Sequence, residues 1–252
     1  MRTALVTGGS RGIGRAISVA LARNEVSVIG LHYRSDEQAV KETVRLVEAV
    51  GATAIPIAAN LDDDPVTTAT GLADRFLDAV EERTGERALD ILVNNAGVTH
   101  PQSLGEIDET TYRKVVDLNL TAPLFLLQHL EPHLRDHGRV INISTGMTRI
   151  AAPTHPVYAV AKSALNGLGL ALAPTLGARG ITINAVMPGI TQTDMTGDWL
   201  DQPGVRDWAE GESVFNRVGQ PDDIAELVAY LASPQARWTT GQTIDATGGS
   251  RL

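Results

Sequence analysis

The first 23 residues of the chain carry the pattern that most constrains its fold. Residues 3–7 (TALVT) are a short apolar run typical of a buried strand, and the glycine-rich sequence 8–14 (GGSRGIG) follows directly. Residues 15–23 then have the spacing of an amphipathic helix. In such a unit the glycines let the backbone approach a pyrophosphate, and the helix N-terminus offers free N–H groups. Glycine turns also occur for structural reasons alone, so the flanking strand and helix are what indicate a phosphate-binding element.

The same alternation of strand and helix continues to the end of the chain. We expect further strands at 26–32, 53–58, 89–93, 139–144, 181–187 and 242–245. Between them we expect helices at 36–50, 65–84, 109–136 and 221–233, and one carrying Tyr158 and Lys162 that Pro174 kinks or ends. The pattern predicts a single α/β domain, 1–252, with a Rossmann-type doubly wound parallel sheet of about seven strands flanked by helices.

Different parts of the expected domain are predicted to have different functions. Residues 1–100 are expected mainly to bind a cofactor, and residues 110–190 are expected to carry catalysis. Residues 191–218 mix glycine, proline and aspartate with Trp199 and Trp208, and their core, 195–215, has an irregular pattern. This composition predicts a mobile lid over an apolar ligand.

Composition excludes several classes of function. The net charge is −9 without a basic block, which argues against nucleic acid and anionic membrane surfaces as partners. The chain has no cysteine, which rules out a disulfide framework, a thiol nucleophile and a thiolate metal site. No signal peptide precedes the first strand and no apolar run reaches spanning length, so we expect a cytoplasmic protein without a membrane partner.

Two clusters could suggest a metal site. They are the acidic run 62–64 and the histidines His129, His133 and His137, which repeat every four residues. Acids at a helix start and cationic side chains near a helix end complement the helix dipole, and this is the commoner explanation of both. We therefore expect no metal.

Tyr158 and Lys162 form the most suggestive pair in the sequence. Residues four apart on a helix share one face, one turn apart. An ammonium near a phenol favours the phenolate and lowers its pKa from about 10 toward working pH, which makes a usable general acid/base. An amphipathic helix could carry both residues by coincidence, although the chain has only 4 tyrosines.

Polar residues in one expected helix and after one expected strand add to this candidate site. Asn119 lies within a predicted helix, where asparagine competes with the backbone for hydrogen bonds. It is either an ordinary buried polar group or one that holds a water or a backbone group near the site. Ser144 and Thr145 end a strand and should point to opposite faces, so they cannot serve interchangeably.

The end of the second strand indicates which dinucleotide would bind. It carries Arg34 and Ser35, with Asp36 better placed to cap the next helix. An acidic residue at this position suits a free ribose 2′-hydroxyl, whereas an arginine suits a 2′-phosphate, and Arg11 is a second candidate phosphate ligand. We favour NADP(H) over NAD(H); the alternative is that both arginines are merely solvated.

Several motifs occur together in the order and spacing of one family. They are TGGSRGIG (7–14), NNAG (94–97), Asn119, Ser144-Thr145, YAVAK (158–162), PGITQT (188–193) and TGQTIDATGG (240–249). On these motifs nearly the whole chain resembles a short-chain dehydrogenase/reductase, nearest to the branch of 3-oxoacyl-[acyl-carrier-protein] reductases. The resemblance implies an NADP-dependent oxidoreductase that reduces a ketone, such as a 3-oxoacyl thioester or related carbonyl, to a secondary alcohol. It also implies a small-molecule or acyl-carrier-bound substrate and a homotetramer; the alternative is a non-catalytic NADP-binding regulator on the same fold.

The resemblance also assigns catalytic roles. Tyr158 would protonate the carbonyl oxygen, Lys162 would hold the nicotinamide ribose and depress the pKa of the tyrosine, and Asn119 would hold a water in the proton relay. The fourth family position, usually serine, lies thirteen residues before the tyrosine, and here it is Thr145. Threonine keeps the hydroxyl but adds a methyl group that stiffens the side chain and crowds the carbonyl.

The resemblance implies a complete set of cofactor residues. Those around the phosphates are Gly8, Ser10, Arg11, Gly12, Ile13 and Gly14, with Arg34 and Ser35 at the 2′-phosphate. Those at the adenine, ribose and nicotinamide are Asn60, Leu61, Asn95, Ala96, Gly97, Pro188, Gly189 and Thr193. Relatives mostly have aspartate where this chain has Asn60. Two further departures, Pro174 and Ala246-Thr247, are expected to affect assembly more than chemistry.

Substrate-pocket candidates follow from position alone. They are Val98, Thr99, His100, Met147, Arg149, His155, Met187, Trp199 and Phe215. Arg149 could meet an anionic substrate or an acyl carrier, or could simply be solvated.

Overall fold

Parallel strands form the central sheet of the computed structural model, which describes residues 1–251, in the order β3-β2-β1-β4-β5-β6-β7. The strands are β1 (Arg2–Val6), β2 (Val26–Tyr33), β3 (Thr53–Ala58), β4 (Leu89–Asn94), β5 (Leu134–Ile143), β6 (Thr182–Pro188) and β7 (Thr243–Ala246). Each neighbouring pair is parallel. The predicted doubly wound sheet of seven strands is confirmed.

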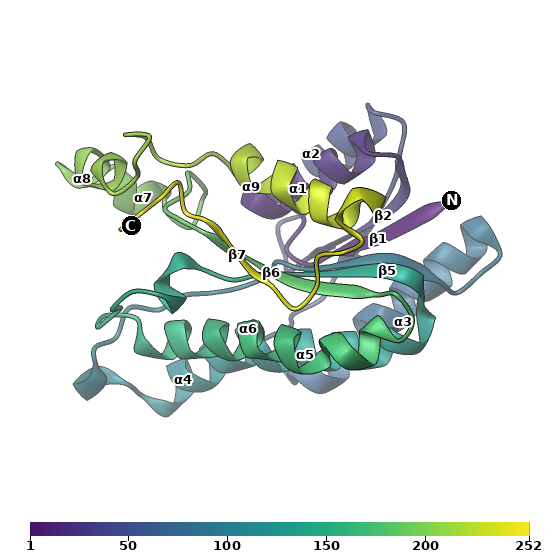
Figure 1. The fold of residues 1–252 in the computed structure, drawn as a ribbon, viewed down its shortest axis with the longest axis horizontal. Helices are drawn as coiled ribbons and strands as arrows, with labels where there is room; N and C mark the ends of the chain where they lie inside the picture. The colour runs from purple at the N-terminus through teal and green to yellow at the C-terminus, as the bar shows by residue number, and fades with distance from the viewer. Residues whose placement is uncertain (252) are drawn as a thin grey trace.

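Helices cover both faces of this sheet (Figure 1). One face carries α1 (Gly12–Arg23), α2 (Glu37–Glu48) and α9 (Pro221–Ala232). The other carries α3 (Pro65–Thr84), α4 (Glu109–Val116), α5 (Ala122–Leu130) and α6 (Pro156–Gly177). The short helices α7 (Gly197–Leu200) and α8 (Val205–Gly211) lie at the end of the molecule opposite the N-terminus. Within residues 1–251 we find no helix with the length and apolar character that crossing a membrane requires.

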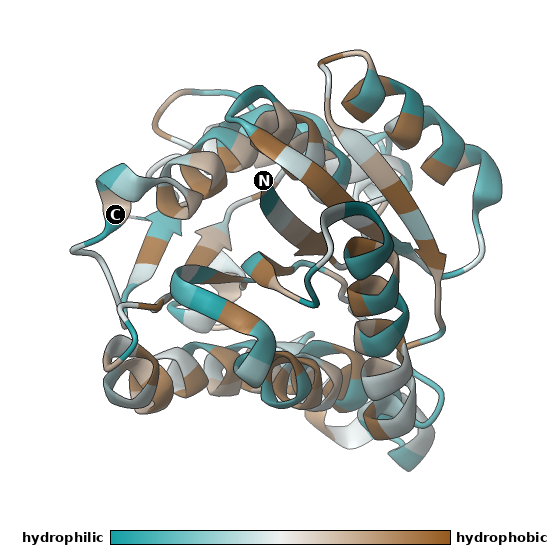
Figure 2. Ribbon diagram, turned by 90° about the vertical axis from the view of Figure 1, so that its right-hand side faces the viewer, coloured by the Kyte–Doolittle hydropathy of each residue, from teal (hydrophilic) through white to brown (hydrophobic). Residues whose placement is uncertain are grey.

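Side-chain alternation along the strands builds one apolar core on each face of the sheet. In β1, Ala4 and Val6 belong to the core beneath α1 and α9, whereas Leu5 belongs to the core above α3. In β2, a Cβ atom at Gly30 would lie 2.5 Å from Cδ2 of Phe76, so the phenyl ring of α3 rests directly on the strand backbone. Figure 2 shows hydrophobic residues in the strands and on parts of the flanking helices.

The strand order places the crevice of the fold between β1 and β4. The chain leaves β1 toward β2 and leaves β4 toward β5, so the loops after these two strands diverge. Thr7 joins the loops at their base, because its Oγ1 accepts hydrogen bonds from the N–H groups of Asn95 (2.9 Å) and Ala96 (3.0 Å). Ligands of open α/β sheets bind at such a point.

The prediction of one long helix at 109–136 is wrong in detail. The structure divides it into α4, a π-helical turn (Asp117–Thr121) and α5, and β5 begins at Leu134 instead of residue 139. Asn119 explains the first break, since its amide donates to the Val115 carbonyl (2.8 Å) and competes with the helix ladder. Pro132 explains the second, because proline has no N–H to continue a helix.

Two further expectations about helices need correction. The helix α6 passes through Pro174 and ends only at Gly177, because a proline in the last turn removes a single N–H from the ladder; Pro174 therefore does not end the helix, and a kink stays a prediction. Residues 195–215 are not irregular throughout, since they contain α7 and α8. The rings of Trp199 and Trp208 meet edge to face between these helices, with centroids 5.8 Å apart. The mobility of this lid stays a prediction.

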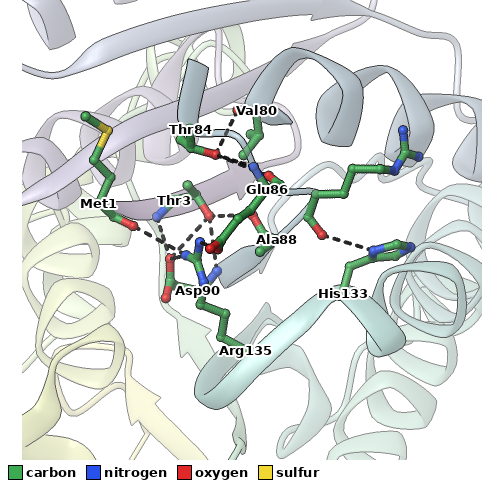
Figure 3. Close-up of polar contacts among 10 residues, drawn as sticks. Met1, Thr3, Val80, Thr84, Glu86, Ala88, Asp90, His133 and Arg135 are labelled. Carbon is green, nitrogen blue, oxygen red and sulfur yellow. Dashed lines mark hydrogen bonds and ion pairs between the residues drawn. The ribbon is translucent and has the colours of Figure 1, made fainter. Parts of the chain in front are cut away.

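A polar network fixes the amino ends of the strands, at the edge opposite the crevice (Figure 3). Asp90 Oδ2 accepts from the Thr3 N–H and from Arg135 Nη1, each at 2.7 Å. Arg135 Nη2 also donates to Glu86 (2.8 Å). The network joins β1, β4 and β5, far along the strands from the candidate site.

Removing the centre of this network should cost stability and leave ligand binding intact. We expect Asp90→Ala to lower the free energy of unfolding by about 2–3 kcal/mol, because the buried Thr3 N–H and the Arg135 guanidinium lose their shared acceptor. The control Glu86→Ala removes a partner whose side chain is 67% exposed, and should cost less than about 1 kcal/mol. Urea denaturation measures both variants, and equal losses would contradict the assignment.

Candidate active site

Tyr158 and Lys162 lie one turn apart at the start of α6. Pro156 occupies the first turn, where its missing N–H costs nothing. Lys162 is buried, with 3% of its surface exposed, and its Nζ lies 6.0 Å from the centroid of the Tyr158 ring. The same Nζ donates to the carbonyl of Ile143 at the end of β5 (2.7 Å). The lysine therefore connects the tyrosine to the end of the neighbouring strand.

The structure reverses the expected direction of the tyrosine pKa. Burial raises the pKa of Tyr158 to about 12, outweighing the lowering effect of a hydrogen bond with the Thr145 side chain. Burial also lowers the pKa of Lys162 to about 8. The predicted depression of the phenol pKa is wrong here because desolvation dominates and the ammonium is directed at a backbone carbonyl. A phenol with this pKa keeps its proton at neutral pH, as a proton donor must.

Thr145 supplies the hydroxyl group beside Tyr158. It follows the end of β5 and caps the 3₁₀ turn Gly146–Thr148, where its Oγ1 accepts from the Met147 N–H (3.3 Å). Its side chain is also close enough to Tyr158 to act on the phenol, whose pKa it lowers. Ser144 is buried, with 4% of its surface exposed. Of the two candidate hydroxyls, the structure thus brings Thr145 to the tyrosine.

Asn119 is held by its amide nitrogen, which donates to the carbonyls of Val98 and Val115, both at 2.8 Å. This leaves Oδ1 facing Gly97, where an added Cβ atom would lie 2.7 Å from Asn119 Oδ1 and 3.4 Å from Lys162 Nζ. The amide and the ammonium therefore meet beside Gly97, and Asn119 holds a backbone group close to the site.

The glycine-rich loop has no space for other residues at its key positions. Gly8 and Gly12 have φ angles of +64° and +53°, in the left-handed region. A Cβ atom at Gly14 would lie 2.1 Å from the Gly8 carbonyl oxygen. The backbone therefore wraps tightly against the N-terminus of α1, whose free N–H groups suit a phosphate. The donor set fits the pyrophosphate of a dinucleotide.

The loop after β6 closes the same crevice. A Cβ atom at Gly12 would lie 3.3 Å from Cγ2 of Thr193, and Asn95 Nδ2 donates to the carbonyls of Thr7 (2.8 Å) and Gly8 (3.1 Å). The residues expected at phosphate, ribose and nicotinamide thus border one another.

Both candidate arginines lie on the surface of this crevice. Arg34 Nη1 is 3.8 Å from Asp62 and Arg11 Nη1 is 3.3 Å from Asp194, with arginine side chains 64% and 56% exposed. Both guanidinium groups therefore remain accessible to an added anion. Asp36 caps α2 as expected, accepting from the Ala39 N–H (2.9 Å).

The residues of the two metal candidates have separate partners. Asp62 faces Arg34 and Lys114, whereas Asp64 caps α3 by accepting from the Thr67 N–H. His129 contacts Asp74 (2.9 Å) and His133 contacts the carbonyl of Arg87 (3.1 Å). In the described part of the chain no three such side chains converge as metal ligands.

The C-terminal segment packs against the loop after β5, which begins with Ser144 and Thr145. Thr247 is 8% exposed, and its Cγ2 would lie 2.8 Å from a Cβ atom at Gly146. Its carbonyl oxygen would lie 2.7 Å from a Cβ atom at Gly189. Thr247 therefore packs between Gly146 of the loop after β5 and Gly189 of the loop after β6, and the expectation that this departure affects mainly assembly stays a prediction.

Arg149 is exposed and at the same time contacts the C-terminal segment. Its Nε lies 2.7 Å from Asp245 Oδ2, and its Nη2 donates to the Ser250 carbonyl. These contacts connect the loop after β5 to the C-terminal segment. Arg149 is therefore solvated and also ion-paired, and a contact with an anionic substrate or an acyl carrier stays a prediction.

The remaining pocket candidates fall into two groups. Loop residues near the candidate catalytic groups are half-buried or buried: Val98, Thr99, His100, Met147, His155 and Met187. The lid residues Trp199 and Phe215 are 37% and 68% exposed. Phe215 lines a cavity of about 410 Å³ formed by the lid, α9 and the C-terminal segment, and the catalytic side chains are not among its lining residues.

His32 is a residue of this crevice that the sequence pattern missed. It is 3% exposed and hydrogen-bonds the Gly8 N–H (3.1 Å). The available signal was a histidine at the end of an otherwise apolar strand, two residues before Arg34.

Comparison with known proteins agrees with this geometry. A family model described as enoyl-(acyl carrier protein) reductase matches residues 8–251. One similar structure is that of LugOII, described as a promiscuous reductase that catalyses keto-reduction at C1 during lugdunomycin biosynthesis. Its sequence is 41% identical to this chain, and the two structures match with a TM-score of 0.94 over 100% of this chain and 98% of that one. The angucycline C-6 ketoreductase LanV with bound NADP is 39% identical, with a TM-score of 0.93 over 98% and 95% of the two chains.

A curated sequence relative extends the match. The 3-oxoacyl-[acyl-carrier-protein] reductase FabG of Staphylococcus aureus is 34% identical over 98% of this chain and 97% of its own. The similarity covers nearly the full length of this chain and of each of these relatives. In the structure, the glycine-rich loop and the Tyr158–Lys162 pair lie in one crevice. The chain therefore belongs to the short-chain dehydrogenase/reductase family of oxidoreductases.

Proposed function

We propose that this protein is an NADP(H)-dependent reductase that converts a ketone to a secondary alcohol, with Tyr158 as the proton donor. The observation that carries the proposal is the position of Tyr158, next to Thr145 and one helical turn from the buried Lys162, whose Nζ lies 6.0 Å from the centroid of the tyrosine ring. This arrangement can polarise a carbonyl oxygen and deliver a proton to it.

The chain's own groups would act on the carbonyl oxygen. Bound NADPH would supply the hydride that forms the new bond to the carbonyl carbon. As that bond forms, the carbon–oxygen π bond breaks and the Tyr158 O–H proton moves to the oxygen, leaving a tyrosinate. Lys162 would stabilise the tyrosinate by its charge, and Thr145 would orient the carbonyl oxygen by a hydrogen bond. Lys162 and Asn119 would then return a proton from solvent to the phenol.

The choice of NADP(H) rests on the end of β2. Arg34 and Arg11 supply accessible guanidinium groups, while Asp36 is engaged as a helix cap. An arginine here suits the 2′-phosphate of NADP(H). The related LanV structure holds NADP, which supports the same assignment for this chain.

For the substrate we propose a free ketone on an apolar, fused-ring aromatic molecule. The lid exposes Trp208 (49%) and Phe215 (68%), surfaces that suit a flat apolar ring. Arg149, the candidate contact for an anionic carrier, is engaged by Asp245. Two similar structures are reductases named for angucycline and lugdunomycin chemistry. A 3-oxoacyl thioester, as named for FabG, is the alternative.

A substrate panel tests this proposal. The loss of NADPH absorbance is followed with a fused-ring aromatic ketone, an aliphatic ketone, and a 3-oxoacyl thioester free or carrier-bound. The highest kcat/KM is expected for the ring ketone. A higher kcat/KM for the carrier-bound thioester would overturn the substrate class. Binding of NADPH without turnover of any ketone would favour a regulator instead.

Substitutions at Thr145 separate the contribution of its hydroxyl from that of its methyl group. We expect Thr145→Val, which keeps the shape but loses the hydroxyl, to lower kcat/KM by roughly 10²-fold. Thr145→Ser keeps the hydroxyl and should stay within about tenfold of the wild type while accepting bulkier ketones. Steady-state kinetics measure both, and unchanged turnover in Thr145→Val would remove Thr145 from the mechanism.

We also propose the homotetramer that the family resemblance implies. Light scattering coupled to size-exclusion chromatography tests it, and a monomeric mass would contradict it.

A further inference from the structure

His32 uses both ring nitrogens and its backbone to join two loops of the crevice. Its Nδ1 accepts a hydrogen bond from the Gly8 N–H (3.1 Å), and its Nε2 lies 3.1 Å from the Ala59 carbonyl oxygen. Its own carbonyl accepts from the Gly9 N–H (2.8 Å). One residue of β2 thus holds the glycine-rich loop after β1 and the chain leaving β3.

These partners fix the protonation state of the ring. The Gly8 N–H can only donate, so Nδ1 must accept, and the Ala59 carbonyl can only accept, so Nε2 must carry the proton. The imidazole is therefore neutral, and a second proton on Nδ1 would face the Gly8 N–H and break that bond. Burial agrees with this, since it lowers the pKa of His32 to about 4.

Few charges surround the ring. On the face of β2 that carries His32, Arg75 of α3 is the cation that acts on it. The neighbouring strand β3 has no charged residue, and β1 has only Arg2 at its far end. In the adjoining loops, Asp62 faces Arg34 and Arg11 faces Asp194.

The rest of the glycine-rich loop is anchored by other groups. The Gly8 carbonyl accepts from Asn95 Nδ2 (3.1 Å), and the Ser10 carbonyl accepts from Arg15 Nη2 and Thr43 Oγ1, both at 2.8 Å. The Gly8 N–H is bound by His32. This bond sets the orientation of the first peptide of the loop, at the residue with the left-handed φ of +64°.

We propose that His32 is a positioning residue for NADP(H) binding: its neutral imidazole fixes the phosphate-binding loop relative to the loop after β3 that would border the adenine. The proposal rests on the proposed NADP(H) function. A loop already held in its binding geometry loses less entropy on binding, so the effect should appear in cofactor affinity and not in the chemical step.

Two substitutions divide the functions of the ring. In His32→Asn, Oδ1 takes the place of Nδ1 and can still accept from the Gly8 N–H, while the contact with Ala59 is lost. In His32→Gln, the longer side chain can reach the Ala59 carbonyl but places no acceptor at Gly8. The two variants thus form a matched pair that differs in the bond to the glycine-rich loop.

The dissociation constant of NADP⁺, measured by calorimetry, should rise roughly tenfold in His32→Gln and stay within about threefold of the wild type in His32→Asn. The kcat at saturating NADPH and the KM of the ketone should change by less than about twofold in both. Amide hydrogen exchange of Gly8 in the cofactor-free protein should accelerate in His32→Gln and not in His32→Asn.

Equal dissociation constants for the two variants, or unchanged Gly8 exchange in His32→Gln, would overturn the proposal. If neither variant folds, the wild-type protein decides: the protection of the Gly8 amide, relative to its intrinsic exchange rate at each pH, should fall as His32 gains a proton, and protection independent of that titration would overturn the proposal. Failure of the wild-type protein to bind NADP⁺ would instead refute the proposed function.

Discussion

Tyr158→Phe is expected to lower kcat for ketone reduction by roughly 10³-fold or more, because it removes the hydroxyl that donates the proton and binds the carbonyl oxygen. The ring and its contact with Lys162 remain, so the dissociation constant of NADPH should change by less than about twofold. Single-turnover kinetics with saturating NADPH measure the chemical step directly.

The matched control is Tyr112→Phe. Tyr112 lies in α4 with 47% of its surface exposed, and the loss of its hydroxyl should leave kcat unchanged. Retention of more than about a tenth of wild-type kcat in Tyr158→Phe would mean that another group supplies the proton.

Gly14→Ala is expected to lower NADP(H) affinity by more than roughly 10²-fold and to destabilise the protein by about 3 kcal/mol or more. The new Cβ atom would lie 2.1 Å from the Gly8 carbonyl oxygen and 2.5 Å from Asn95 Nδ2, so the glycine-rich loop must separate from the start of α1. Calorimetric titration with NADP⁺ and thermal unfolding measure the two effects.

Gly71→Ala is the corresponding control, because Gly71 lies within α3 and an added Cβ atom there meets nothing within 4 Å. It should leave NADP(H) affinity unchanged and stabilise the fold by about 0.5–1 kcal/mol through helix propensity. A Gly14→Ala variant that bound NADP⁺ as the wild type does would show that the loop is not the phosphate site.

The sequence predicts those features of the fold that depend on the local pattern of apolar and polar residues. Apolar strands separated by amphipathic helices predict a parallel doubly wound sheet, and the structure has that sheet. The break between α4 and α5 was not predicted because it depends on one side-chain bond, from Asn119 to the Val115 carbonyl. Hydrophobic periodicity does not report such a bond.

For the candidate site, residue types and spacing indicate Tyr158, Lys162 and the glycine-rich loop, whereas their electrostatics depend on contacts between distant segments. The Tyr158 pKa rises because the surrounding structure removes water from the phenol, although the residue is only half-buried, and no spacing rule gives the extent of this desolvation. The engagement of Arg149 by Asp245 joins residues far apart in sequence. His32 shows its role only once β1, β2 and β3 are side by side.

Isotope transfer tests the central claim most directly. The protein is incubated with a fused-ring aromatic ketone and with NADPH that carries deuterium at the transferable position of the nicotinamide, on the face from which this protein takes the hydride. The product is analysed by mass spectrometry and NMR. We predict a secondary alcohol that carries one deuterium at the former carbonyl carbon, formed by the wild type and nearly absent with Tyr158→Phe. Tight binding of NADPH with no deuterium delivered to any ketone of the panel would contradict the account.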